Sequence, residues 1–221
     1  MLQLQQMRTR VGEILEDSSF VQWPEALVNQ YLNDAAQDFA MRTKCYRRYS
    51  SPLSANGSID VSKPFAFYSV PSDTHELESV WVNGYHVPQA RIDRMPYQWD
   101  IEFCNSTAEP SAYLYGDFGL EVIRFWPYPS DAAFPTVYVY YTALPPTMTT
   151  NTATPTGIPA RYNIALVYYT VAMCYRKNFE DADKSKSEEF MALYLDQIRD
   201  CQGRIARLLN AEGMGVPYRH L

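Results

Sequence analysis

The chain has 221 residues, of which 47% are hydrophobic and 20% are charged, and its formal net charge is −6. This composition is that of a folded globular protein, and it argues against a disordered chain. Residues 51–150 alone carry eleven acidic and four basic side chains. An acidic middle segment argues against a groove that grips nucleic acid, because such binding depends on Lys and Arg releasing counterions.

The first 50 residues predict two helices. Apolar residues recur at helical spacing from Leu4 to Leu15 and again from Leu27 to Phe39, with Pro24 placed for the first turn of the second helix. A basic cluster follows, made of Arg42, Lys44, Arg47 and Arg48. It is either a helix end at which cations complement the dipole or a contact with an acidic partner subunit.

The pattern changes at Ser50, where the hydrophobic periodicity falls to two. Residues 51–145 therefore predict an antiparallel β-domain inserted between helical segments. Its clearest element is a hairpin at residues 80–87, whose Asn83-Gly84 pair suits the positive φ angles of a type I′ turn. Further strands are predicted at residues 97–103, 113–115, 120–126 and 136–141. A Pro/Thr-rich connector at residues 143–156 has no periodicity.

Residues 146–210 predict a helical hairpin. The run from Ile164 to Tyr175 is apolar almost all round, so this helix should be buried on most sides. It is too short to span a membrane, which needs about 20 residues. The polar stretch from Lys177 to Ser187 is expected to separate it from a second helix with an apolar stripe from Phe190 to Leu208.

The predicted fold class is therefore α+β. Residues 1–50 and 146–210 are expected to form one α-helical bundle, because the apolar helix needs cover on most sides and the N-terminal stripes can provide it. The antiparallel β-domain would be an insertion in that bundle. Residues 211–221 are expected to form an extended C-terminal arm, since they contain two glycines and a proline without periodicity.

The cysteines and the N-terminus carry little functional information. Cys45, Cys104, Cys174 and Cys201 are widely spaced and form neither a zinc motif nor a redox motif. Cys174 and Cys201 fall on apolar helical faces, where a thiol packs as a small hydrophobe. The N-terminal residues lack the charged and apolar regions of a secretory signal, so we expect a cytoplasmic protein with reduced thiols.

Histidines and acidic residues do not form a convincing site. His75, His86 and His220 each lack a second histidine nearby in the sequence. Glu180, Asp181 and Asp183 resemble the start of a calcium loop, but Lys184 stands where an oxygen ligand belongs, which favours a loop between helices. We therefore predict no catalytic, cofactor-binding or metal-binding residues.

Asp100 and Glu102 leave an alternative open. They would point to the same face of one strand, as the carboxylates of a glycosidase or any solvent-facing pair would do. A small hydrolase is thus one alternative function. A carbohydrate-binding or tail-fibre-type β-module is another, because it would explain the aromatic residues between positions 58 and 142.

Several segments of the chain resemble a known protein family. In the first 50 residues these segments are Trp23-Pro24 with Leu27, and Tyr31-Leu32-Asn33-Asp34-Ala35. In the β-domain they are Val80-Trp81-Val82-Asn83-Gly84, and Ile123-Arg124-Phe125-Trp126-Pro127-Tyr128-Pro129 followed by Val137-Tyr138-Val139-Tyr140-Tyr141. The last is Ile158-Pro159-Ala160-Arg161-Tyr162 leading into Tyr168-Tyr169. Their order is similar to that in the head-to-tail adaptor proteins of tailed bacteriophages. The similarity spans most of the chain and consists of degenerate patterns.

The resemblance implies a structural virion protein of the neck, assembled in the cytoplasm of the host bacterium, without enzymatic activity or a cofactor. Such adaptors form a ring, usually a dodecamer, between the portal protein above and tail or nozzle proteins below. DNA passes through the ring without specific binding, and no membrane is involved. The 18 tyrosines of the chain would supply material for subunit contacts.

The resemblance also bears on the C-terminus. The last four residues, Tyr218, Arg219, His220 and Leu221, combine bulky apolar groups with cations, which suits anchoring on a partner. Adaptor proteins commonly extend a C-terminal arm onto the portal, so we expect these four residues to dock there. The alternative is a frayed end without a role.

Overall fold

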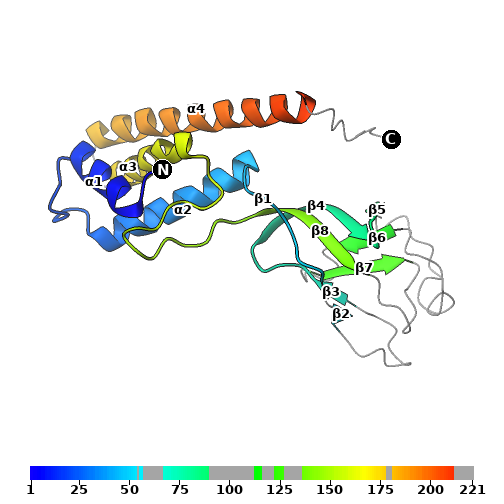
Figure 1. Cartoon of the computed structure of the whole chain (residues 1–221). Helices are drawn as coiled ribbons and strands as arrows, with labels where there is room; N and C mark the ends of the chain where they lie inside the picture. The colour runs from blue at the N-terminus through cyan, green and yellow to red at the C-terminus, as the bar shows by residue number, and fades with distance from the viewer. Residues whose placement is uncertain are drawn as a thin grey trace. The chain divides into compact units, whose positions relative to one another are not determined.

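The computed structural model describes residues 1–53, 55–56, 67–89, 112–115, 122–126, 136–177 and 181–211. The chain divides into two compact units, one formed by Met1–Tyr46 with Leu144–Leu221 and the other by Arg47–Ala143. The first unit contains the helices and the second the strands (Figure 1). The predicted α+β class, with helices at both chain ends and strands between them, is confirmed. The strand expected at residues 97–103 lies outside the described residues.

The helical unit contains four α-helices in its described part: α1 (Leu4–Ile14), α2 (Glu25–Thr43), α3 (Asn163–Lys177) and α4 (Asp181–Ala211). A 3₁₀ turn, Ala160–Tyr162, leads into α3, and Pro159 is its N-cap residue. Pro24 is likewise the N-cap of α2, one residue before the first helical turn. Each proline thus stands just before a helix. Proline is tolerated there, because the N–H that it lacks is needed for hydrogen bonds only in the helix interior.

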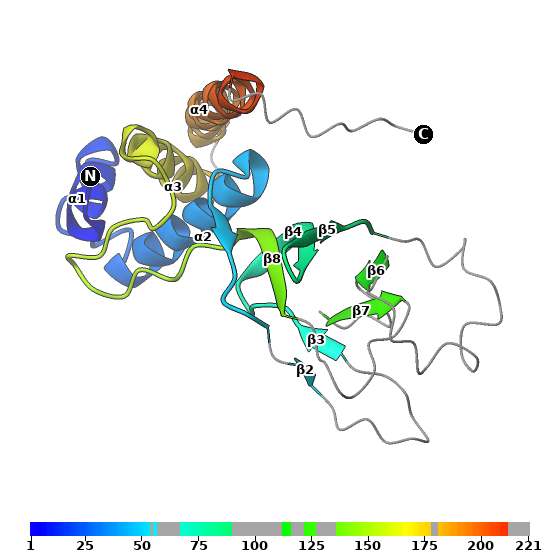
Figure 2. The same cartoon turned by 45° about the vertical axis from the view of Figure 1, so that its right-hand side comes forward.

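Helix α3 is the centre of the helical unit. It packs against α1, α2 and α4, and these three helices lie around it in both views (Figures 1 and 2). Leu166, Val167, Val171 and Cys174 are completely buried there. This arrangement explains why the sequence of α3 is apolar almost all round.

Helix α4 begins earlier than the sequence pattern predicts. The expected connector from Lys177 to Ser187 is wrong for residues 181–187, which are helical. Ser187 is buried, and its hydroxyl donates a 2.9 Å hydrogen bond to the carbonyl of Ala172 in α3. The ammonium of Lys186 lies 5.1 Å from the ring centroid of Tyr175, also in α3.

Two of the three acidic residues at this point belong to the helix, whereas Glu180 lies outside the described residues. Asp181 and Asp183 stand in the first turn of α4, so neither a calcium loop nor a loop between helices contains them. Negative charge is favourable at this end of a helix, because the first turn carries the positive end of the helix dipole.

The β unit contains two four-stranded sheets in its described part (Figure 2). The first has the order β1 (Arg47–Tyr49), β8 (Val137–Ala143), β4 (Thr74–Val82) and β5 (Tyr85–Val87). The second has the order β2 (Ala55–Asn56), β3 (Phe67–Ser69), β7 (Val122–Trp126) and β6 (Ala112–Tyr115). The pairs between these strands are antiparallel, as predicted.

The predicted hairpin at residues 80–87 is confirmed. Asn83 and Gly84 have φ angles of 50° and 87°, the positive values that a type I′ turn requires. Asn83 also ties this turn to the start of β8. Its backbone N–H donates to the Thr136 carbonyl at 3.0 Å, and its side-chain Oδ1 accepts from the Thr136 N–H at 3.0 Å.

The core of the β unit draws on both sheets. Val80 and Val139 are buried in the first sheet, and Tyr68, Ile123 and Phe125 are buried in the second. The rings of Tyr68 and Phe125 meet edge to face with centroids 5.4 Å apart. Two isolated bridges extend the pairing: Leu53, between β1 and β2, pairs with Val137 of β8, and Gln89, after β5, pairs with Tyr113 of β6.

Candidate interaction surfaces

One face of the first sheet carries exposed aromatic side chains. Val137, Val139 and Tyr141 of β8 are buried, so the alternating Tyr138 and Tyr140 belong to the opposite face. Residues that are directly opposite in neighbouring strands share a face. Tyr49 is opposite Tyr140 and Trp81 is opposite Tyr138, so Tyr49 and Trp81 also belong to this face. His86 is opposite Trp81 and therefore belongs to it as well. We call Tyr49, Trp81, His86, Tyr138 and Tyr140 the aromatic face.

The side chains of the aromatic face contact one another. The ring of Tyr49 stacks on Tyr138, with centroids 5.2 Å apart and planes inclined by 17°. Trp81 meets His86 edge to face at 5.6 Å. Even so, Tyr49 is 53% exposed, Tyr140 38% and Trp81 36%. Adjoining exposed aromatic groups are typical of a surface that contacts another molecule.

Ion pairs fix the edge strand next to the aromatic face. Arg47 Nε lies 3.1 Å from Glu78 Oε1, an ion pair without hydrogen-bond geometry. The Thr142 hydroxyl donates to the same Glu78 oxygen at 2.8 Å. Arg48 Nη1 donates to Asp73 Oδ2 at 2.6 Å, so both arginines of β1 hold acidic partners in the β unit. These contacts keep β1, and with it Tyr49, in a defined position.

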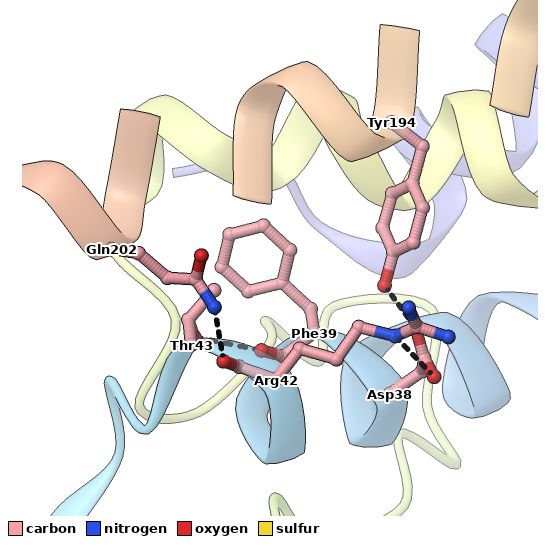
Figure 3. Close-up of polar contacts among 6 residues, drawn as sticks. All are labelled: Asp38, Phe39, Arg42, Thr43, Tyr194 and Gln202. Carbon is pink, nitrogen blue, oxygen red and sulfur yellow. Dashed lines mark hydrogen bonds and ion pairs between the residues drawn. The ribbon is translucent and has the colours of Figure 1, made fainter. Parts of the chain in front are cut away.

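A second group of polar contacts joins α2 to α4 in the helical unit (Figure 3). The Tyr194 hydroxyl donates to Asp38 Oδ2 at 2.7 Å, and Arg42 Nε lies 2.8 Å from the same oxygen. Burial and this hydrogen bond raise the pKa of Tyr194 above its ordinary value. Gln202 Nε2 donates to the Arg42 carbonyl at 2.7 Å, which gives one of the unpaired carbonyls at the end of α2 a partner.

The four predicted basic residues are divided between the two units. Arg42 lies in the last turn of α2, and Lys44 is its C-cap with φ 52°. Arg47 and Arg48 lie in β1, so the prediction of a helix end fails for them. Arg42 and Lys44 belong to the helical unit and the two β1 arginines to the β unit. The guanidinium groups of Arg42, Arg47 and Arg48 all pair with carboxylates of their own unit.

The other candidate residues lie partly inside and partly outside the ranges that the structure describes. Within those ranges, no group of three or more His, Cys, Asp or Glu side chains is placed to hold a metal ion. His75 lies in β4 and His86 in β5. Asp100, Glu102, Cys104 and Tyr218–Leu221 lie outside the described residues. Among the helices of the described ranges, none is both long and apolar enough to cross a membrane.

Comparison with known families decides the class of protein. The family model described as SU10 adaptor protein matches residues 2–214, nearly the whole chain. The chain belongs to the SU10 adaptor protein family. The expected relationship to bacteriophage adaptors is thus confirmed, and the protein is a structural adaptor component of a virion. No curated protein matches the chain.

Sequence reasoning did not single out the aromatic face of this adaptor. A signal was present, because Tyr138 and Tyr140 occupy alternate positions of a strand whose other positions are also apolar or aromatic. In a half-exposed strand, polar residues are expected at one of the two sets of positions. Tyrosine at the outward positions makes this face a candidate interaction surface.

Proposed function

We propose that this adaptor forms a ring that joins the portal to the tail of a bacteriophage and extends the DNA channel. The match to the SU10 adaptor family over residues 2–214 carries this proposal. The net charge of −6 supports it, because a channel must let DNA pass without holding it. We also propose that the ring lies between the portal above and tail or nozzle proteins below, and that it assembles in the cytoplasm of the host.

The aromatic face supports the ring. In a closed ring each subunit uses two unlike surfaces, one for each neighbour. We assign the aromatic face to one of these surfaces, because Tyr49 and Tyr140 supply large rigid contact area at a small entropic cost. The ring is proposed to be a dodecamer. The basic residues Arg42, Lys44, Arg47 and Arg48 are proposed to lie near subunit contacts, with the carboxylates that already bind three of them holding the side chains in place.

The test is electron microscopy of the purified adaptor mixed with the purified portal ring. The proposal expects a second ring of density on one face of the portal, coaxial with its channel. A variant with Tyr49→Ser and Tyr140→Ser should remain folded and should form no ring. Tyr85→Ser is the matched control, because Tyr85 is 68% exposed yet pairs with the buried Val82, on the other side of the sheet.

Two results would count against the proposal. If the wild-type adaptor leaves portal rings unoccupied while it binds a different virion component, the portal assignment is wrong. If the double variant forms rings as readily as the wild type, the aromatic face is not the subunit contact. A folded double variant, shown by an unchanged circular dichroism spectrum, is required for the second conclusion.

The aromatic face also favours a second candidate function. Flat aromatic side chains on an antiparallel sheet suit stacking on sugar rings, as in a carbohydrate-binding β-module. Tryptophan fluorescence of Trp81 should then respond to added bacterial surface polysaccharide, whereas the ring proposal expects no response. The family match makes the adaptor function the better supported of the two.

A further inference from the structure

The apolar stripe of α4 continues past the part of the helix that the bundle covers. In the first part of the stripe, Tyr194, Ile198 and Cys201 are buried. Ile205 is half-buried, and Leu208, the next position of the stripe, is 62% exposed. These positions follow one another at steps of three and four residues, so they lie on one face of the helix. The same face of α4 therefore changes from covered to uncovered along its length.

The uncovered part of α4 begins after Gln202. The side chain of Gln202 still donates a 2.7 Å hydrogen bond to a carbonyl of α2. Most of the residues that follow are exposed, namely Gly203, Arg204, Ala206, Arg207 and Leu208. Figure 1 shows these turns, in red, continuing past the start of α3. We call residues 203–208 the projecting end of α4.

The projecting end is basic. It carries Arg204 and Arg207, and residues 201–211 contain no acidic side chain. The guanidinium of Arg204 pairs with Asp200 one turn earlier, at 2.9 Å. Arg207 Nε donates to the Gly203 carbonyl at 3.1 Å. Both arginine side chains are thus held against the helix before any partner binds, which limits the conformational entropy that binding removes.

The chemistry of the projecting end complements that of the aromatic face. A guanidinium group stacks on the flat face of tyrosine or tryptophan, and a leucine side chain packs against the same rings. Residues 51–150, which supply most of the aromatic face, carry eleven acidic and four basic side chains. The acidic segment of one copy therefore attracts the basic end of another.

We propose that the projecting end of α4 binds the aromatic face of a second copy of this chain. Leu208 packs against the exposed rings of Tyr49 and Tyr140, and Arg207 stacks on an aromatic ring. Resting on the proposed function, this is the lateral contact that repeats around the ring. Because the two surfaces are unlike, a pair of copies leaves one surface of each kind unoccupied, and further copies add until the ring closes.

The experiment places a photoreactive amino acid, p-benzoylphenylalanine, at position 208 of the full-length chain in place of Leu208. Isotope-labelled and unlabelled copies are mixed and illuminated, alone and with purified portal rings, and cross-linked peptides are identified by mass spectrometry. We expect cross-links that join a labelled copy to an unlabelled one at peptides containing Tyr49, Trp81 or Tyr140. The double variant Tyr49→Ser with Tyr140→Ser should reduce their yield about tenfold or more, whereas Tyr85→Ser should leave it unchanged.

Leu193 is the matched position for the probe, because it is a 43% exposed leucine of α4 outside the projecting end. A probe at Leu193 should give no cross-link to the aromatic face of another copy. Arg207→Glu should lower the yield from the probe at position 208 about tenfold, because it sets a negative charge against an acidic segment. An unchanged circular dichroism spectrum would show that this variant keeps its helices.

The position-208 probe can also overturn the proposal. Cross-links to another surface of the second copy, to the portal alone or within one chain would do so, and so would the absence of cross-links between copies in both mixtures. Cross-links at the aromatic face beside unoccupied portal rings would leave this contact standing and refute the portal assignment. An adaptor ring on the portal without such cross-links would refute this contact and leave the portal assignment standing.

Discussion

The hydroxyl of Tyr194 in α4 donates a 2.7 Å hydrogen bond to Asp38 in α2, and the carboxylate of Asp38 also binds Arg42 one turn further along α2. The phenol ring is fully buried, with Phe39 at 6.3 Å and Tyr169 at 5.1 Å between ring centroids. A single side chain of α4 therefore contributes both apolar burial and a charge-assisted hydrogen bond to the packing of α2.

Tyr194→Phe should keep the ring contacts and remove only this hydrogen bond. We expect a loss of about 1–3 kcal/mol in the free energy of unfolding, because Asp38 then lacks one partner in a partly buried place. Urea denaturation followed by circular dichroism measures the change. Tyr168→Phe is the control, since Tyr168 is half-buried and its hydroxyl makes no hydrogen bond with the described residues. Equal effects of the two substitutions would contradict the assignment.

Substitution by alanine at each of three glycines should change the stability of the protein by a different amount. Gly157 has φ 77° and a Cβ there would collide with the ring of Tyr46, so Gly157→Ala should destabilise the protein by several kcal/mol, roughly 2–4. Gly84 has φ 87° in open space, which predicts a smaller loss of about 1 kcal/mol. Gly203 lies within α4 in open space, so Gly203→Ala should stabilise it by about 0.5–1 kcal/mol. Thermal unfolding of the three variants tests this order.

Stability should fall at alkaline pH. Burial and the hydrogen bond to Asp200 raise the pKa of Tyr162 from 10.0 to about 12 in the folded protein. Between these two values the unfolded chain releases the phenol proton while the folded chain keeps it, so stability decreases as pH rises above 10. Tyr162→Phe should lower stability at pH 8 and weaken its dependence on pH between 10 and 12. A dependence unchanged by the substitution would show that other groups cause it.

Deletion of residues 212–221 tests the proposed docking arm. We expect the melting curve to stay unchanged, because these residues follow the last residue of α4, Ala211, and a non-periodic tail adds no core. Attachment to portal-bearing capsids should fail, and co-sedimentation of adaptor with capsids measures it. Alanine at Tyr218 and Leu221 alone should weaken attachment in the same direction. Normal attachment of the deleted protein would mean that the arm has no part in docking.

Local patterns in the sequence determined several elements of this adaptor. The apolar run from Ile164 to Tyr175 predicts a buried helix because helical periodicity and burial are properties of the segment itself. Asn83-Gly84 determines the hairpin because few residue pairs adopt two successive positive φ angles at low cost. The order of such segments was also enough to indicate the adaptor family, which the match over residues 2–214 confirms.

Contacts between distant segments decided the rest. The sequence pattern of residues 181–187 predicts a connector, but in the structure these residues are helical. Lys186 and Ser187 contact Tyr175 and Ala172 of α3 from this part of the helix. Arg47 was predicted to belong to the basic residues at the end of α2, but the pairing of β1 with β8 places it in a β-strand.

The aromatic face depends on tertiary structure in the same way. Strand register places Tyr49 opposite Tyr140. This pairing cannot be known from spacing, because the free energy that selects it comes from burying surfaces that the chain brings together only on folding.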